Sequence, residues 1–272
     1  MPTPSNSKRR AASLLLPPVD VRHLLTPDVR TQGPRPLCLP FSTSFAHEAA
    51  RATAAASTAE ALAVEPLWQH CVHAGTAGHD GTTLRAIADA VEHTGQPLET
   101  MWPYNDTLGV GTEPTPAAAG TTAFNTAGLF DVPLAHDGIE EDLEATLTAG
   151  LPFIVVLEIT NEFDSPGIDG EIDVPSLSSP VNDYHAVTAV GAATNAAGDS
   201  RRLLIRNSWG PGWGVGGYGW LPYDYLVAFA VQAAAIDPDC AMAYWGMAMS
   251  NFDNQKRGGD FIKEAKERRE KA

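Results

Sequence analysis

Three short segments of this 272-residue chain carry residue types that can perform nucleophilic catalysis. The first segment places Cys38 shortly after Gln32, where a loop runs into an Ala-rich stretch. The second places His185 at the start of an apolar run, and the third opens with Asn207 in the sequence Asn-Ser-Trp-Gly-Pro-Gly-Trp-Gly. A thiol, an imidazole and a side-chain amide are the parts of a nucleophile, its base and the group that orients the base.

The positions of these residues can also stabilise the thiolate and the oxyanion that such chemistry creates. A thiol at a helix N-terminus beside an imidazolium has a lowered pKa, so Cys38 is predicted to be a reactive thiolate. The side-chain carbonyl of Asn207 can hold His185 in one tautomer. The backbone N–H of Cys38 and the side-chain amide of Gln32 can stabilise an oxyanion. These four residues together predict acyl transfer through a thioester.

The three segments resemble the marks of the papain-like cysteine peptidases, which are Gln-Gly-x4-Cys, His-Ala-Val near a strand start and Asn-Ser-Trp-Gly. The resemblance covers residues 19–226 and follows the family's chain order. It implies a cysteine-type peptidase, a hydrolase, with Cys38 as the nucleophile and His185 as the general base and acid. Asn207 would orient the histidine, and Gln32 would donate to the oxyanion. The implied substrate is a peptide or a protein, with no cofactor.

The same resemblance implies two further parts of a substrate site. Asp80 and Gly81 resemble the glycine-containing strip that lines the family's substrate cleft, which implies backbone hydrogen bonds to an extended peptide. Trp209 follows Asn207 closely and would cover the pair of Asn207 and His185 from water. These three residues are therefore the predicted substrate-binding positions.

The flank of the nucleophile departs from the family pattern. The family has Cys-Gly-Ser-Cys-Trp, whereas this chain reads Arg35-Pro-Leu-Cys38-Leu39, without the upstream half-cystine and with prolines nearby. A displaced Cys38 N–H would weaken the oxyanion hole, and a shift of ~1 Å can cost ~100-fold in rate.

This departure leaves a second hypothesis open, a catalytically degenerate papain-like module that binds peptides or proteins and docks through a helical tail. The altered flank favours this alternative, whereas the intact Gln32, His185 and Asn207 favour an enzyme. Amidase, peptide ligase and transglutaminase-like acyl transfer stay open within the enzyme class. A scaffold protein defined by its tail is a third hypothesis.

Other groups of polar residues are interpreted without chemistry. Cys71, His73, His79 and Asp80 offer one Cys-x-His unit and no second paired half, so no metal site is predicted. His47 and its neighbour Glu48 are interpreted as the polar face of a long helix.

The elements that must position the site change type along the chain. Apolar periodicity predicts helices in the first half, and β-rich runs between Gly and Pro predict strands in the second. We therefore expect an α+β, papain-like fold with a helical lobe, an antiparallel β-barrel-like lobe and the site at the cleft between them. The predicted helices span residues 38–63, 82–95 and 139–150, and the predicted strands span 152–159, 185–192, 203–207 and 218–221.

Composition excludes several classes of protein. Hydrophobic residues make up 44% of the chain, which is enough for a core, and 33 acidic against 18 basic residues argue against nucleic-acid binding. No apolar run approaches the ~20 residues of a membrane helix, and the basic start of the chain is followed by too short an apolar run for a signal peptide. Three cysteines cannot build a disulfide framework. A cytoplasmic protein without an inhibitory prodomain is expected.

Composition also suggests three parts of the chain. Residues 1–18 are predicted to be a flexible lead-in, residues 19–230 the papain-like peptidase domain, and residues 234–272 a helical tail. The tail resembles one tetratricopeptide repeat unit, and a single unit cannot bury its own apolar face. It is therefore expected to pack on the peptidase domain or to bind a protein partner.

Overall fold

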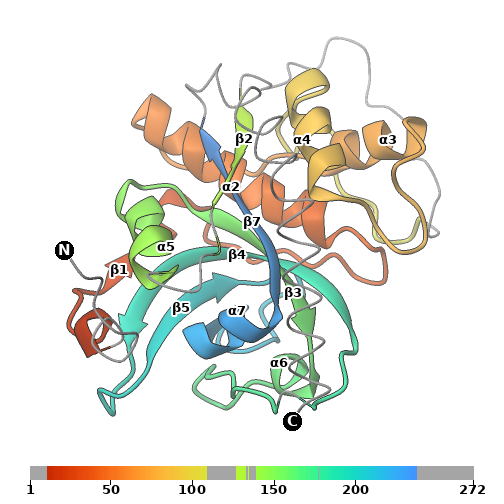
Figure 1. Ribbon diagram of the computed structural model, residues 1–272. Helices are drawn as coiled ribbons and strands as arrows, with labels where there is room; N and C mark the ends of the chain where they lie inside the picture. Colours follow the sequence, from red (N-terminus) through yellow and green to blue (C-terminus); the bar gives the residue numbers. More distant parts are fainter. Residues whose placement is uncertain (1–10, 109–126, 133, 135–138, 177, 238–272) are drawn as a thin grey trace.

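The computed structural model describes residues 11–108, 127–132, 134, 139–176 and 178–237. Helices α2, α3 and α4 form one half of the molecule, and an antiparallel sheet with α5, α6 and α7 around it forms the other (Figure 1). The helices are η1 (Arg22–Leu24), α2 (Cys38–Ala55), α3 (Glu65–His73), α4 (Leu84–His93), α5 (Ile139–Thr148), α6 (Asn161–Asp164) and α7 (Tyr223–Phe229). The strands are β1 (Val19–Asp20), β2 (Gly128–Asp131), β3 (Phe153–Ile159), β4 (Asp183–Thr194), β5 (Arg201–Arg206), β6 (Tyr218–Pro222) and β7 (Ala230–Asp237). The predicted α+β class is confirmed.

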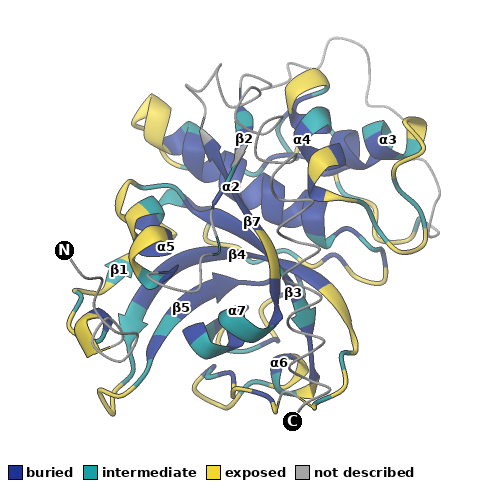
Figure 2. Ribbon diagram, in the orientation of Figure 1, coloured by how far each residue is buried: buried dark blue, intermediate teal, exposed yellow. Residues whose placement is uncertain are grey.

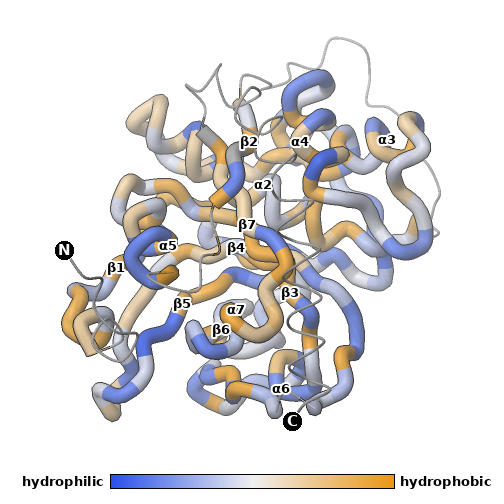
Figure 3. The backbone as a smooth tube through the Cα atoms, viewed as in Figure 1, coloured by the Kyte–Doolittle hydropathy of each residue, from blue (hydrophilic) through white to orange (hydrophobic). Residues whose placement is uncertain are grey.

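The sheet runs in the order β2-β7-β3-β4-β5-β6, and β1 pairs with β4. Its register pairs Leu157 of β3 with His185, and Thr188 of β4 with Arg206 of β5. His185 therefore lies near the end of the sheet at which β5 leads into Asn207. Stretches of β3 and β5 are hydrophobic, whereas the outward-facing side of α5 is hydrophilic (Figure 3).

Helix α2 is the part of the helical half that borders the sheet, and it is buried over most of its length (Figure 2). Phe41, Phe45 and Ala49 pack in one apolar cluster with the sheet, whereas Leu39 and Ala46 pack in a second cluster with α3 and α4. Because both faces of α2 are covered, packing from both halves holds the backbone at its first residue, Cys38.

Strong periodic patterns predict the elements well. The helix predicted after Gly81 is α4, and the Thr83 side chain caps it by accepting a hydrogen bond from the Ala86 N–H at 3.3 Å. The helix predicted over residues 139–150 is α5, and the four predicted strands are β3, β4, β5 and β6.

The helix predicted over residues 38–63 ends earlier, at Ala55. Ala56 takes a left-handed conformation with φ of 46°. Further on, the Leu62 N–H donates to the Glu48 carboxylate at 3.0 Å, and the Leu62 carbonyl accepts from the Ser44 hydroxyl at 2.9 Å. These buried tertiary hydrogen bonds outweigh the helix propensity of the Ala-rich run.

The sequence patterns do not predict α3, β2 or β7. Strand β7 is Ala-rich, and its state is decided by its pairing with β3 on one side and β2 on the other. Ala234, Ala235 and Ile236 are buried in it. The sheet thus continues to Asp237, beyond the predicted domain end at residue 230 and into the first residues of the predicted tail. Residues 238–272 lie outside the described residues.

The end of the predicted lead-in is bonded to the sheet. The Thr194 hydroxyl donates to the Leu14 carbonyl at 2.8 Å, and the Arg201 guanidinium donates to the carbonyls of Leu16 and Pro17 at 3.0 and 2.8 Å. This part of residues 1–18 is therefore held in place. Within the described ranges, no helix combines the length and the apolar composition needed to span a bilayer.

Candidate active site

A buried histidine–asparagine pair forms the centre of the site. The His185 Nε2–H donates to Asn207 Oδ1 at 2.7 Å, and the same oxygen accepts the Ser208 backbone N–H at 2.7 Å. His185 is only 4% exposed and Asn207 is fully buried. Because Nε2 carries the proton, Nδ1 of the neutral ring is left with a lone pair. The structure thus gives His185 the tautomer that a general base needs.

Aromatic rings surround this histidine. The Trp209 ring centroid lies 4.6 Å from that of His185, and the Phe163 centroid lies 5.8 Å away in an edge contact. Phe163 comes from the short helix α6, and its backbone carbonyl accepts a hydrogen bond from the Trp213 indole at 3.2 Å. Trp209 packs beside His185 as predicted. Phe163 carries no motif, so sequence reasoning missed it.

The Cys38 thiol lies at the start of α2 and faces the start of β4. The backbone amides of Ala186 and Leu39 lie near the thiol and favour its thiolate form. Ala186 directly follows His185, and the Thr188 hydroxyl of the same strand donates to the Ser42 carbonyl of α2 at 3.2 Å. The packing of α2 on β4 therefore brings the thiol to the strand that carries the histidine.

Burial governs the ionisation of both groups. Desolvation raises the pKa of the Cys38 thiol above its ordinary value, because it outweighs the backbone amides that favour the thiolate, and the nearby Asp183 charge adds to the rise. Burial also lowers the pKa of His185 to about 4, against the opposing hydrogen bond to Asn207. The sequence-based prediction of a lowered thiol pKa is therefore corrected, because the pKa of Cys38 is raised in the folded chain. Each charge is unfavourable alone, so thiolate and imidazolium are expected to form together.

Gln32 is tied to the Asn207 loop by several hydrogen bonds. Its backbone N–H donates to the Ser208 carbonyl at 2.7 Å, and its side-chain Oε1 accepts the Ser208 hydroxyl at 2.6 Å. Its Nε2 donates to the Arg35 carbonyl at 2.9 Å, and its own carbonyl accepts the Tyr104 hydroxyl at 2.6 Å. Since Oε1 is fixed by Ser208, the amide orientation is set and a second Nε2 hydrogen remains for another acceptor.

The proline-rich flank of Cys38 is compatible with a regular helix start. The Leu37 N–H donates to the Arg35 carbonyl at 2.8 Å, and the Phe41 N–H donates to the Leu37 carbonyl at 3.0 Å. Pro40 lies in the first turn of α2, where a missing N–H costs little.

The predicted substrate strip lies beside this flank, but its backbone is already paired. Gly81 and Gly78 exchange two backbone hydrogen bonds of 3.0 and 3.2 Å, and Gly81 has φ of 88°. A Cβ atom on Gly81 would lie 3.3 Å from the Pro36 carbonyl oxygen. Asp80 is exposed and pairs with His79 at 3.2 Å. Glycine is thus required here for close approach to the nucleophile loop, whereas the hydrogen bonds that Gly81 was expected to offer a peptide go to Gly78.

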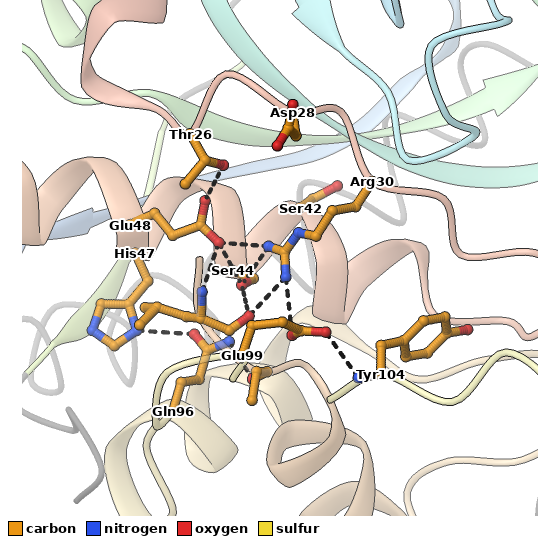
Figure 4. Close-up of polar contacts among 12 residues, drawn as sticks. Thr26, Asp28, Arg30, Ser42, Ser44, His47, Glu48, Gln96, Glu99 and Tyr104 are labelled. Carbon is orange, nitrogen blue, oxygen red and sulfur yellow. Dashed lines mark hydrogen bonds and ion pairs between the residues drawn. The ribbon is translucent and has the colours of Figure 1, made fainter. Parts of the chain in front are cut away.

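A buried polar network supports the helix side of the site (Figure 4). The Glu48 carboxylate is fully buried and accepts from Arg30 at 2.5 Å and from Thr26 at 3.1 Å. His47 is also buried, and its Nδ1 lies 2.9 Å from Gln96 Oε1. Burial lowers the pKa of His47 to about 4. The interpretation of His47 and Glu48 as a polar surface face is therefore wrong. Arg30 links this network to the strand-like segment that carries Gln32.

Cysteine and histidine residues also occur together around α3. Cys71 is buried, and its backbone carbonyl accepts the Thr76 hydroxyl at 3.0 Å. In the described part of the chain, no group of three or more His, Cys, Asp or Glu residues is arranged to hold a metal ion.

The molecule combines a cysteine at the start of a helix with a histidine–asparagine pair on an antiparallel sheet, and this combination defines a class of protein. The sequence-family model of the papain family cysteine proteases matches residues 17–235. The chain belongs to this family, and the resemblance seen in the sequence is confirmed. The repeat-like tail gains no support from comparison with known proteins.

Individual relatives agree with this assignment. Cysteine proteinase 3 of Entamoeba histolytica is 31% identical over 151 residues, which cover 54% of this chain and 43% of that protein. The matched stretches span less than half the length of each curated relative.

Solved structures show the same fold. Xylellain, a cysteine protease from Xylella fastidiosa, matches with a TM-score of 0.67 and 24% identity, over 86% of this chain and 90% of its own. A cysteine protease of Carica candamarcensis in complex with E-64 matches with a TM-score of 0.57 and 22% identity, over 81% of this chain and 97% of its own. At such identities the likeness establishes the fold alone.

Proposed function

We propose that this chain is an active cysteine-type peptidase, which hydrolyses peptide bonds through a thioester on Cys38. The observation that carries the proposal is the buried hydrogen bond between His185 Nε2 and Asn207 Oδ1, with the Cys38 thiol near the backbone amide of Ala186, which follows His185. Membership of the papain family supports the same chemistry. The degenerate binding module is not favoured, because the chain belongs to the papain family cysteine proteases and retains Gln32, Cys38, His185 and Asn207.

The reaction begins with a coupled proton transfer. The Nδ1 lone pair of His185 takes the proton from the Cys38 thiol, and the sulfur attacks the carbonyl carbon of the scissile peptide bond. The oxyanion that forms is stabilised by the Cys38 N–H and by the second Nε2 hydrogen of Gln32. His185 then gives its proton to the leaving amine.

The second half of the reaction releases the acid product. A water molecule enters, His185 accepts one of its protons, and the hydroxide adds to the thioester carbonyl. When the tetrahedral intermediate collapses, the Cys38 thiolate leaves and recovers its proton from His185. Asn207 keeps the imidazole in one orientation throughout, because its Oδ1 accepts the Nε2 hydrogen in both protonation states.

The proposed substrate is an extended stretch of a peptide or protein. The structures of a Carica candamarcensis cysteine protease and of bromelain from Ananas comosus, which share this fold, are complexes with the inhibitor E-64, and this supports a similar ligand here. We assign Trp209, Asp80 and Gly81 to substrate binding. Since the Gly81 backbone is paired with Gly78, the proposed contribution of this turn is surface contact beside the nucleophile loop rather than backbone hydrogen bonds.

Active-site labelling tests this function most directly. E-64 should modify Cys38, identified by peptide mapping, and the wild-type chain should cleave fluorescently labelled casein. Cys38→Ala should abolish both signals, whereas Cys71→Ala serves as the matched control and should retain both. A wild-type protein that neither reacts with E-64 nor cleaves casein or a peptide library would support the degenerate module instead.

A further inference from the structure

Arg35 places a buried charge on the loop that leads to the nucleophile. It stands where the family pattern has the upstream half-cystine, and it is only 1% exposed. Its guanidinium donates to both carboxylate oxygens of Glu65, at 2.6 and 3.0 Å, and to the Asn105 carbonyl at 2.8 Å. It also lies over the Tyr104 ring, 5.0 Å from the centroid. This two-pronged pair fixes the direction as well as the position of the arginine.

The same arginine is connected to the predicted oxyanion donor. The Arg35 carbonyl accepts one Nε2 hydrogen of Gln32 at 2.9 Å and the Leu37 N–H at 2.8 Å. The Tyr104 hydroxyl, next to the guanidinium, donates to the Gln32 carbonyl at 2.6 Å. The backbone of Arg35 therefore sets the direction of the Gln32 amide, and its side chain sets the position of that backbone.

Stability alone gives little reason for such a pair. A buried ion pair is often no more stabilising than well-packed apolar side chains of the same volume, because both charges lose their hydration. What a bidentate pair provides is a defined geometry. An oxyanion donor needs that geometry, since a displacement of ~1 Å can cost ~100-fold in rate.

We propose that Arg35, held by Glu65, is a positioning residue for the oxyanion hole, and that it does the work of the half-cystine missing from the nucleophile loop. The inference rests on the proposed peptidase function. It assigns to Arg35 an effect on the tetrahedral intermediate through Gln32, and none on the Cys38–His185 pair itself.

The test compares two conservative variants at two buried arginines. Arg35→Lys keeps the charge but loses the fork that holds Glu65. Arg201→Lys is the matched control, because Arg201 also makes a buried two-pronged pair, with Glu144 at 2.9 and 2.5 Å, in a part of the sheet that carries no proposed site residue. Both variants are assayed with one quenched fluorogenic peptide, selected for cleavage by the wild type.

The positioning role has a specific kinetic signature. Arg35→Lys should lower kcat by ~10-fold or more with little change in KM, since the contact it disturbs matters only once the oxyanion forms. The rate of Cys38 alkylation by iodoacetamide should stay at the wild-type value, because alkylation needs the thiolate but no oxyanion hole. Arg201→Lys should leave kcat, KM and alkylation unchanged.

Several outcomes would overturn the inference. It fails if Arg35→Lys retains wild-type kcat, or if kcat and the alkylation rate fall together, which would mean that the whole site is disturbed. If thermal melting shows that Arg35→Lys is unfolded, the double variant Arg35→Met with Glu65→Leu replaces the pair by apolar side chains, and the same split between kcat and alkylation is expected. If neither variant folds, Arg35 is a determinant of the fold and the positioning role is withdrawn. An inactive wild type would instead refute the peptidase function.

Discussion

The two sides of the proposed active site hold their candidate catalytic groups by different means. On the sheet side, His185 has one hydrogen bond to Asn207 and is otherwise enclosed by the rings of Trp209 and Phe163. On the helix side, Gln32 lies on the loop that leads to Cys38 at the start of α2, and the position of this loop depends on hydrogen bonds and buried charges.

The difference follows from what each group must do. Aromatic packing excludes water but tolerates small shifts, which suits a base whose proton affinity must be controlled. Hydrogen bonds fix direction, which suits an oxyanion donor that must point at one atom. Variants on the two sides should therefore fail in different ways.

The largest effect is expected for the two residues that exchange a proton across this boundary. Cys38→Ala and His185→Ala should each lower kcat by on the order of 10⁴-fold or more, because they act as a unit. The double variant should be hardly worse than either single variant, measured with the same fluorogenic peptide. Losses that multiply in the double variant would mean that the two residues act independently and that the proposed pair is wrong.

Next in size is the loss of the oxyanion donor. Gln32→Ala should lower kcat by ~100-fold or more, about 3–4 kcal/mol of transition-state stabilisation, with a much smaller change in KM. Ser208→Ala removes only the hydroxyl that orients Gln32 and should cost less. Unchanged turnover in Gln32→Ala would remove this residue from the site and break the contrast between the two sides.

A third prediction concerns stability at acid pH. Buried His47, on the helix side, has its pKa lowered from 6.5 to about 4. Between these pH values the unfolded chain therefore binds more protons than the folded chain. The free energy of unfolding is highest above pH ~6.5 and falls by on the order of 3 kcal/mol as the pH decreases toward ~4. Urea unfolding should show a flatter pH profile for His47→Gln. Parallel profiles for wild type and variant would show that His47 does not remain neutral when buried.

His185 offers the same comparison on the sheet side, since its pKa is also lowered to about 4. His185→Gln should flatten the same pH profile, and combining it with His47→Gln should flatten it further. This pair of variants separates an effect of burial, which both histidines share, from catalysis, which we propose for His185 alone.

The smallest effect is expected at the end of the sheet. Ending the chain after Asp237 should leave kcat unchanged, because β7 and its pairing with β2 and β3 remain complete. Ending it after Ala233 removes the buried Ala234, Ala235 and Ile236 and should lower the melting temperature markedly. Loss of activity in a folded chain ending at Asp237 would show that residues 238–272 shape the site.

The order of the motifs along the chain was enough to propose which residues are catalytic. Cysteine, histidine and asparagine chemistry requires particular side chains, and only a few positions in this sequence supply them together. The same local logic predicts α4, with its threonine cap, and the β-rich strands, because periodicity and capping act over a few residues.

What the tertiary structure decided are the states that depend on partners distant in sequence. In the sequence, Arg35 is a charged residue on a loop, and only the fold shows that Glu65 and Asn105 bind it in the interior. Likewise, only the fold shows that the helical residue Glu48 is buried against Arg30 and Leu62. Strand β7 is Ala-rich and becomes a strand only because β2 and β3 supply hydrogen-bond partners on both sides. The pKa of Cys38 follows the same rule, since a helix N-terminus argues for a thiolate and burial argues against it. Desolvation depends on every atom packed around a group, and that is a property of the folded chain rather than of any segment.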